Sequence, residues 1–148
     1  MKNEKLYVAY GSNMNVTQMR HRCRTAVAVA VGEVKDYRLR FYGRYGSAVA
    51  TIEKAKGSSV PVLVWKIRPK DEKSLDIYEG YPHLYRKETI EIYINGEQYS
   101  GMAYIMNENS AFSYNHPSPF YVRIIEEGYK DCGLEPQLLY DAIAKNCK

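Results

Sequence analysis

The feature that most constrains the fold of this chain is a strictly alternating segment followed by a hairpin turn. Residues 89–94, TIEIYI, carry an isoleucine at every second position, which is the pattern of a strand with one buried face. Asn95-Gly96 follows and is the strongest short signal for a two-residue β-hairpin. Residues 100–106 then return as a second apolar strand. The sequence therefore predicts an antiparallel sheet with one face that must be covered.

The other strand and helix signals extend this sheet into a complete domain. Strand patterns cover residues 6–9, 25–31, 33–42, 48–53 and 60–67, with a polar turn at 54–59 and a loop at 107–118. Helix patterns cover residues 16–22, 71–78, 119–131 and 136–146, and Asp71 is the expected cap of the second helix. We therefore predict a single α+β domain over residues 1–148, built as a small, mostly antiparallel closed β-barrel with a few flanking helices.

Length and cysteine content indicate a domain that folds without disulfide bonds or a structural metal ion. A chain of 148 residues can bury a substantial core without a metal or a disulfide. Cys23, Cys132 and Cys147 are widely spaced and form no Cys-x-x-Cys pair, so we expect free thiols and no metal site. Residues 1–5 lack the apolar stretch of a signal peptide, and the longest uncharged apolar run, 26–31, is far too short to cross a bilayer. We therefore expect a cytoplasmic protein.

The formal net charge of +4 permits weak attraction to nucleic acid. Arginines are concentrated in two places, at Arg20, Arg22 and Arg24 and at Arg38, Arg40 and Arg44. In residues 37–41 they alternate with apolar side chains, which is typical of the solvent face of a half-buried strand. We therefore expect these arginines to be exposed, and we expect no nucleic-acid partner.

Tyrosine is the unusual residue of this composition, with 15 copies against 3 phenylalanines and 1 tryptophan. A buried tyrosine combines a large apolar ring with a hydroxyl that needs a hydrogen-bond partner. The surplus fits a cavity lined with hydroxyl groups, and it equally fits the preference of tyrosine for strands. The composition leaves both interpretations open.

Residues 10–14, YGSNM, connect the first strand to the first helix and form the first candidate site. Gly11 allows a sharp turn and a close approach of a ligand to the backbone. Ser12 and Asn13 are residue types that cap helices, so the amides after them would point into the turn together with the positive end of the helix. Such a turn either holds a carboxylate or an oxyanion, or is an ordinary strand, turn and cap.

Glu79 is the second candidate, because the other catalytic patterns are missing. The 3 histidines have no metal-binding spacing, and Ser12 lacks the Gly-x-Ser-x-Gly elbow of a nucleophile. Glu79 ends a predicted helix between Tyr78 and Gly80, beside a turn that contains Pro82 and close to Tyr85. Exclusion of water there would raise its pKa and suit it to accept and return a proton. An exposed glutamate at the end of a helix is the alternative.

Taken together, these motifs resemble the gamma-glutamylcyclotransferase-like (AIG2-like) family. The likeness rests on residues 10–14 and on residues 75–80, LDIYEG, which Tyr85-Arg86 follow. It extends through Thr51-Ile52, 62–65, Ala103-Tyr104, 117–121, Ile124, Gly128-Tyr129 and Gly133-Leu134, and so covers nearly the whole chain. Arg24 departs from the family pattern, where proline is frequent, and so does Pro61, where glycine is common. Both lie outside the central motifs, so they bear on the substrate more than on the fold.

The resemblance implies a cavity between the Gly11 turn and Glu79. It implies an enzyme that cyclises a small gamma-glutamyl amine or amide to 5-oxoproline and releases the amine, with Glu79 as general acid and base and no cofactor. The implied substrate-binding residues are Tyr10, Gly11, Ser12, Asn13, Met14, Tyr85 and Tyr121. The alternative is a non-catalytic module that binds a small metabolite in the same barrel. The sequence leaves open which amine is released and whether the chain forms a homodimer.

Overall fold

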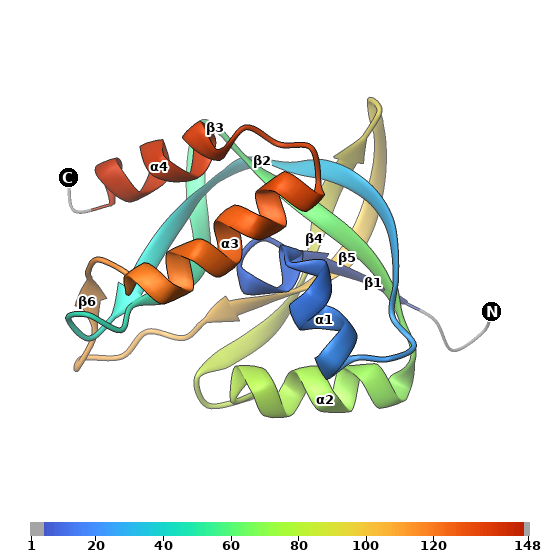
Figure 1. The fold of residues 1–148 in the computed structure, drawn as a ribbon, viewed down its shortest axis with the longest axis horizontal. Helices are drawn as coiled ribbons and strands as arrows, with labels where there is room; N and C mark the ends of the chain where they lie inside the picture. The colour runs from blue at the N-terminus through green and yellow to red at the C-terminus, as the bar shows by residue number, and fades with distance from the viewer. Residues whose placement is uncertain (1–4, 147–148) are drawn as a thin grey trace.

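A closed five-stranded β-barrel forms the centre of the computed structural model, which describes residues 5–146 (Figure 1). Its strands are β1 (Lys5–Ala9), β2 (Val27–Gly43), β3 (Val49–Ile67), β4 (Tyr85–Ile94) and β5 (Glu97–Met106). They follow the order β3-β1-β5-β4-β2, and the pairing of β2 with β3 closes the ring. Only β1 and β5 pair in parallel within the ring. The predicted α+β barrel is confirmed, and it is a mixed barrel.

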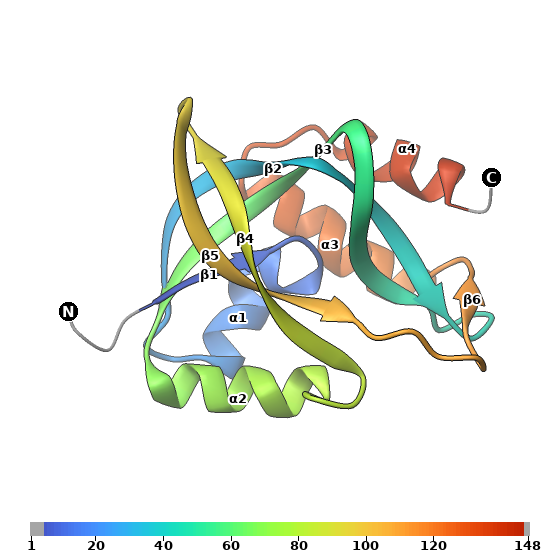
Figure 2. The same ribbon diagram turned by 180° about the vertical axis from the view of Figure 1, so that it is seen from behind.

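The helices lie outside the barrel. They are the 3-10 turn η1 (Ser12–Met14), α1 (Val16–Arg22), α2 (Pro69–Glu79), α3 (Pro119–Asp131) and α4 (Pro136–Lys145). Figures 1 and 2 show α3 and α4 over one face of the barrel, with α1 beside α2 at the lower end. Within residues 5–146, no helix has the length and apolar character needed to span a membrane.

The hairpin predicted from the alternating segment is confirmed, since β4 and β5 pair from Tyr85↔Met106 to Ile94↔Glu97. Asn95 and Gly96 both have positive φ, at 51° and 83°, as a type I′ turn requires.

Strands β2 and β3 are longer than the sequence predicts. Gly32 does not end a strand, since it pairs with Val62 of β3 within β2. A glycine is found there because β4 passes close to the backbone of β2. A Cβ on Gly32 would lie 2.8 Å from the Tyr93 carbonyl oxygen. The predicted turn at 54–59 lies within β3 as an irregularity of its pairing with β2, where residues 55–58 lie opposite Asp36 alone. The predicted loop at 107–118 contains the short strand β6 (Ser113–Tyr114), which pairs with the end of β2.

Asp71 is not the cap of α2, as the sequence predicts, but its third residue. Pro69 fits the first turn of a helix because it has no N–H to leave unpaired, so the helix begins two residues earlier and Arg68 is its cap. The Asp71 carboxylate is buried and accepts from the Arg68 amide at 3.0 Å and from the Thr25 hydroxyl at 2.6 Å. Asp71 therefore fixes the start of α2 to the connection between α1 and β2.

The prediction that the arginines are exposed is wrong for Arg40, which is 4% exposed. Its guanidinium donates to the carbonyl oxygen of Asn146 at 2.7 Å and to Glu53 at 2.6 Å, and it stacks on the Tyr114 ring at 3.4 Å. Asn146 at the end of α4 covers Arg40 on this face of β2, which alternation along the strand alone does not reveal.

Helix α3 packs directly against the turn that follows β1. A Cβ on Gly128 would lie 2.8 Å from the backbone nitrogen of Asn15 and 2.8 Å from the carbonyl carbon of Met14. The Asn15 side chain donates to the carbonyl oxygen of Ile124 at 2.9 Å and to Glu127 at 2.8 Å. The position of residues 11–15 therefore depends on α3.

Gly128→Ala is expected to lower the free energy of unfolding by about 1–3 kcal/mol, because the added methyl group forces two backbones apart. The measurement is thermal or denaturant unfolding, with Arg123→Ala on the exposed side of α3 as the control. Glycine to alanine in a helix otherwise stabilises a protein by about 0.5–1 kcal/mol. A higher melting temperature for Gly128→Ala would therefore contradict the close approach.

Candidate active site

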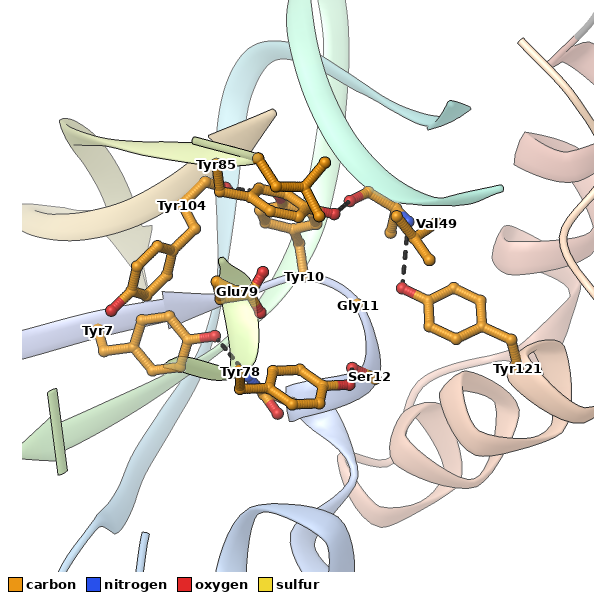
Figure 3. A pocket seen from close by; sticks show the side chains of 13 residues that line it. Tyr7, Tyr10, Gly11, Ser12, Val49, Tyr78, Glu79, Tyr85, Tyr104 and Tyr121 are labelled. Carbon is orange, nitrogen blue, oxygen red and sulfur yellow. Dashed lines mark hydrogen bonds between the residues drawn. The ribbon is translucent and has the colours of Figure 1, made fainter. Parts of the chain in front are cut away.

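A cavity of about 220 Å³ lies between the turn after β1 and the end of α2 (Figure 3). Tyrosine and the residues of these two segments dominate its wall. The lining residues are Tyr7, Tyr10, Gly11, Ser12, Asn13, Val49, Ala50, Tyr78, Glu79, Leu84, Tyr85, Tyr104 and Tyr121. The structure therefore brings the two candidate motifs of the sequence together on one cavity.

Three residues of the turn at Gly11 line this cavity, namely Gly11, Ser12 and Asn13. Met14 N–H donates to the Gly11 carbonyl oxygen at 3.0 Å, which closes the 3-10 turn. Within residues 5–146, the amides of Gly11, Ser12 and Asn13 donate no hydrogen bond to another protein group. Gly11 is closely packed, since a Cβ there would lie 3.0 Å from the Ala50 Cβ. The turn can therefore supply donors to an anionic or carbonyl group.

The cap of α1 is Asn15, and not Ser12 or Asn13 as the sequence predicts. The Asn15 side chain accepts from Gln18 N–H at 3.0 Å, and Val16 N–H donates to Asp131 at 3.2 Å. The 3-10 turn moves the start of the helix beyond the cavity, and neither Asn15 nor Val16 lines it. The start of α1 therefore lies outside the cavity, and the amides of the turn are the backbone groups available there to donate.

Glu79 is the last residue of α2, and Gly80 ends the helix in the left-handed conformation with φ 63°. The carboxyl group is partly buried, and no group within residues 5–146 donates a hydrogen bond to it. Burial raises the pKa of Glu79 to about 7, and the nearby Arg22 guanidinium partly opposes this rise. Glu79 can therefore accept and return a proton near neutral pH.

The hydroxyl groups of the lining tyrosines are engaged with the protein. Tyr10 donates to the Tyr104 carbonyl oxygen at 2.5 Å, and Tyr85 donates to the Ala50 carbonyl oxygen at 2.6 Å. Tyr121 accepts from Ala50 N–H at 3.1 Å. These bonds hold the rings around the cavity. At these positions the tyrosine rings form the wall, and their hydroxyl groups anchor the rings to the backbone.

The structure separates one predicted site residue from the others. Met14 is fully buried beneath the turn and is not a lining residue, whereas the other predicted positions all line the cavity. The motif analysis did not single out Tyr7, Tyr78 and Tyr104, which also line it. Tyr78 and Tyr104 lie within the family motifs, whereas the surplus of tyrosine was the only signal for Tyr7, because a strand pattern does not tell which tyrosines face a cavity.

The model of the gamma-glutamyl cyclotransferase, AIG2-like family matches residues 7–127, and the chain belongs to this family. The gamma-glutamylcyclotransferases of Mus musculus and Homo sapiens are both 33% identical over 141 residues, covering 87% of this chain and 72% of theirs. A solved structure described as a gamma-glutamyl cyclotransferase is 27% identical, with a TM-score of 0.84 over 94% of this chain and 86% of its own. The resemblance inferred from the motifs is confirmed.

Glu79→Gln is expected to raise the melting temperature relative to the wild type at pH 8 and to lose this advantage near pH 4.5. Between the ordinary glutamate pKa of 4.5 and the folded-state pKa of about 7, the folded state binds more protons than the unfolded state. The free energy of unfolding of the wild type therefore falls as the pH rises through this range, whereas the neutral glutamine of the variant contributes no such fall. At about 1.4 kcal/mol per tenfold change in proton affinity, the effect is at most a few kcal/mol.

Thermal unfolding of both proteins at several pH values makes this measurement. Glu91→Gln, an exposed glutamate on β4, serves as the control and should show no such dependence on pH. A difference in melting temperature between Glu79→Gln and the wild type that is the same at pH 4.5 and pH 8 would show that Glu79 is well solvated.

Proposed function

We propose that this protein converts a small gamma-glutamyl amine or amide to 5-oxoproline and releases the amine. The observation that carries the proposal is the Glu79 carboxyl group, whose pKa burial raises to about 7 in the cavity shared with the Gly11 turn. Family membership supports the same reaction, since the curated relatives are named gamma-glutamylcyclotransferases.

The substrate supplies its own nucleophile in this reaction. Its α-amine attacks its γ-carbonyl carbon, so a C–N bond forms and the carbonyl oxygen becomes an oxyanion. Glu79 accepts the proton of the attacking amine and passes it to the leaving nitrogen. The C=O bond then re-forms and the bond to the leaving nitrogen breaks. The reaction needs a folded substrate geometry and one proton carrier, so we propose that it proceeds without a cofactor.

The other groups of the cavity would hold the substrate in this geometry. The amides of Gly11, Ser12 and Asn13 would bind the α-carboxylate of the glutamyl group. Tyr10, Tyr85 and Tyr121 would shape the wall around it. Met14 would act indirectly, by packing beneath the turn. Substrates of this kind are small metabolites, which fits the proposed location in the cytoplasm.

A screen of gamma-glutamyl amines, amides and peptides for release of 5-oxoproline, read by mass spectrometry, tests the proposal. We expect at least one compound to be turned over. Binding of gamma-glutamyl compounds without any release of 5-oxoproline would instead identify the protein as a non-catalytic module that binds a metabolite.

Glu79→Gln is expected to lower kcat by about 100-fold or more, because it removes the general base while keeping the size of the side chain. The KM should change less, since the proposed contacts to the carboxylate lie on the Gly11 turn. Steady-state kinetics on a substrate from the screen measure both quantities. Glu91→Gln is the control, and an unchanged kcat in Glu79→Gln would contradict the proposed mechanism.

The cysteines are expected to be dispensable for turnover. Neither Cys23 nor Cys132 lines the cavity, and burial raises the pKa of each thiol to about 11, so both are protonated at neutral pH. Cys147 lies outside the described residues. Replacement of all three by alanine should leave kcat essentially unchanged, at some cost in stability because Cys23 is buried. Loss of activity in the folded variant would point to a cysteine nucleophile.

A further inference from the structure

Hydrogen bonds to backbone carbonyl oxygens fix the direction of two tyrosine O–H groups at the wall of the cavity. Tyr10 and Tyr85 both donate to backbone carbonyl oxygens, so their protons are already used within the wall. Tyr7 differs from them, because its hydroxyl oxygen accepts from the side-chain nitrogen of Asn13 at 2.9 Å. A phenol that accepts still has its own proton to donate.

The direction of the bond between Asn13 and Tyr7 is set by Arg22. The Arg22 guanidinium donates to the side-chain oxygen of Asn13 at 2.7 Å, and a guanidinium can only donate. The amide oxygen of Asn13 must therefore face Arg22, and its NH₂ group must face Tyr7. A second bond to Gln18 at 3.0 Å and stacking on the Tyr78 ring at 3.6 Å hold Arg22 in place.

The proton of Tyr7 has no acceptor among residues 5–146, and the hydroxyl lines the cavity. Figure 3 shows the Tyr7 hydroxyl beside Glu79, whereas Tyr121 lies on the opposite side of the cavity. Burial, with the nearby Glu79 carboxylate, raises the pKa of Tyr7 well above its ordinary value. Tyr7 therefore keeps its proton throughout the physiological pH range.

We infer that Tyr7 is a catalytic residue that donates a hydrogen bond to the γ-carbonyl oxygen of the substrate, and that Arg22 and Asn13 are positioning residues that aim its proton. This inference rests on the proposed function. Glu79 moves the proton from the attacking α-amine nitrogen to the leaving nitrogen. Both nitrogens are bonded to the γ-carbon in the tetrahedral intermediate. A donor beside Glu79 is therefore placed for the oxygen on that same carbon, while the Gly11 turn remains for the α-carboxylate.

The hydrogen bond of Tyr7 strengthens during the reaction. As the α-amine attacks, the electron pair of the carbonyl bond moves to oxygen, and the Tyr7 O–H then faces a full negative charge. When the bond to the leaving nitrogen breaks, the pair returns and the carbonyl of 5-oxoproline re-forms. Tyr7 keeps its proton in every step. Its contribution is greatest in the transition state, so it should appear mainly in kcat.

The decisive variant is Asn13→Asp, which keeps the shape of the side chain but reverses one hydrogen bond. One carboxylate oxygen still accepts from Arg22. The other replaces the NH₂ group, so the bond to Tyr7 can persist only if the Tyr7 O–H donates to it. The proton of Tyr7 is then lost to the cavity. Tyr7→Phe removes the same proton directly and keeps the ring, so it decides the question by itself if Asn13→Asp fails to fold.

We expect Tyr7→Phe and Asn13→Asp each to lower kcat by about 100-fold, the scale for loss of one oxyanion donor. The double variant should be no slower than either single variant, because both remove one and the same proton. Tyr140→Phe, an exposed tyrosine of α4, is the control. Single-variant kcat values within about threefold of the wild type would overturn the inference. Losses that multiply in the double variant would assign the effect of Asn13→Asp to its charge and would overturn the positioning role of Asn13.

Calorimetric binding of 5-oxoproline separates this inference from the proposed function. If the wild type binds 5-oxoproline but turns over no gamma-glutamyl compound, the proposed reaction fails. Weaker binding by about tenfold in both Tyr7→Phe and Asn13→Asp would then still support the Tyr7 donor, and unchanged binding would overturn it. A wild type that neither binds 5-oxoproline nor releases it would overturn both.

Discussion

The pairing of β2 with β3 is the interaction on which the rest of the structure depends. It runs from Val27↔Lys66 to Tyr42↔Val49 and closes a sheet that would otherwise keep two open edges. Closure also places the backbone of Ala50 at the cavity. Its carbonyl accepts from Tyr85 and its N–H donates to Tyr121, so one residue of β3 holds tyrosines from β4 and α3. The geometry of the cavity is thus a consequence of barrel closure.

Burial of Glu79 links the stability of the fold to the chemistry of the site. The helix that carries Glu79 ends at Gly80, which leaves the carboxyl group at the cavity without a protein donor within the described residues. An ionised carboxylate in this place lowers stability, and the same desolvation raises its proton affinity. A solvated glutamate would make the protein more stable at neutral pH and a poorer proton carrier. The cost in stability is therefore tied to the proposed function.

Two arginines, Arg22 and Arg40, make the same pair of contacts, one to a tyrosine ring and one to an asparagine side chain. Arg22 stacks on Tyr78 and donates to the side chain of Asn13, while Arg40 stacks on Tyr114 and donates to Asn146. In each pair the guanidinium donates to the side-chain oxygen of the asparagine, so the NH₂ group of the amide points the other way. At Asn146 the fixed amide bonds to the backbone of Phe41 and fastens the end of α4 to β2. At Asn13 it sets the direction of the bond to Tyr7.

The sequence by itself determined the elements whose signals are local. Alternation and turn chemistry predicted the hairpin at Asn95-Gly96, and proline and glycine marked the ends of α3. Motif order identified the Gly11 turn and Glu79, although they lie far apart in the chain. Only the tertiary structure decided that Asn15 caps α1, that β3 continues through residues 54–59, and that Tyr7 faces Glu79. The reason is physical: the bonds of the Asn15 side chain to α3, the pairing of β3 with β2 and the approach of Tyr7 to Glu79 all involve residues from other elements, and local propensity carries no information about which partner will be there.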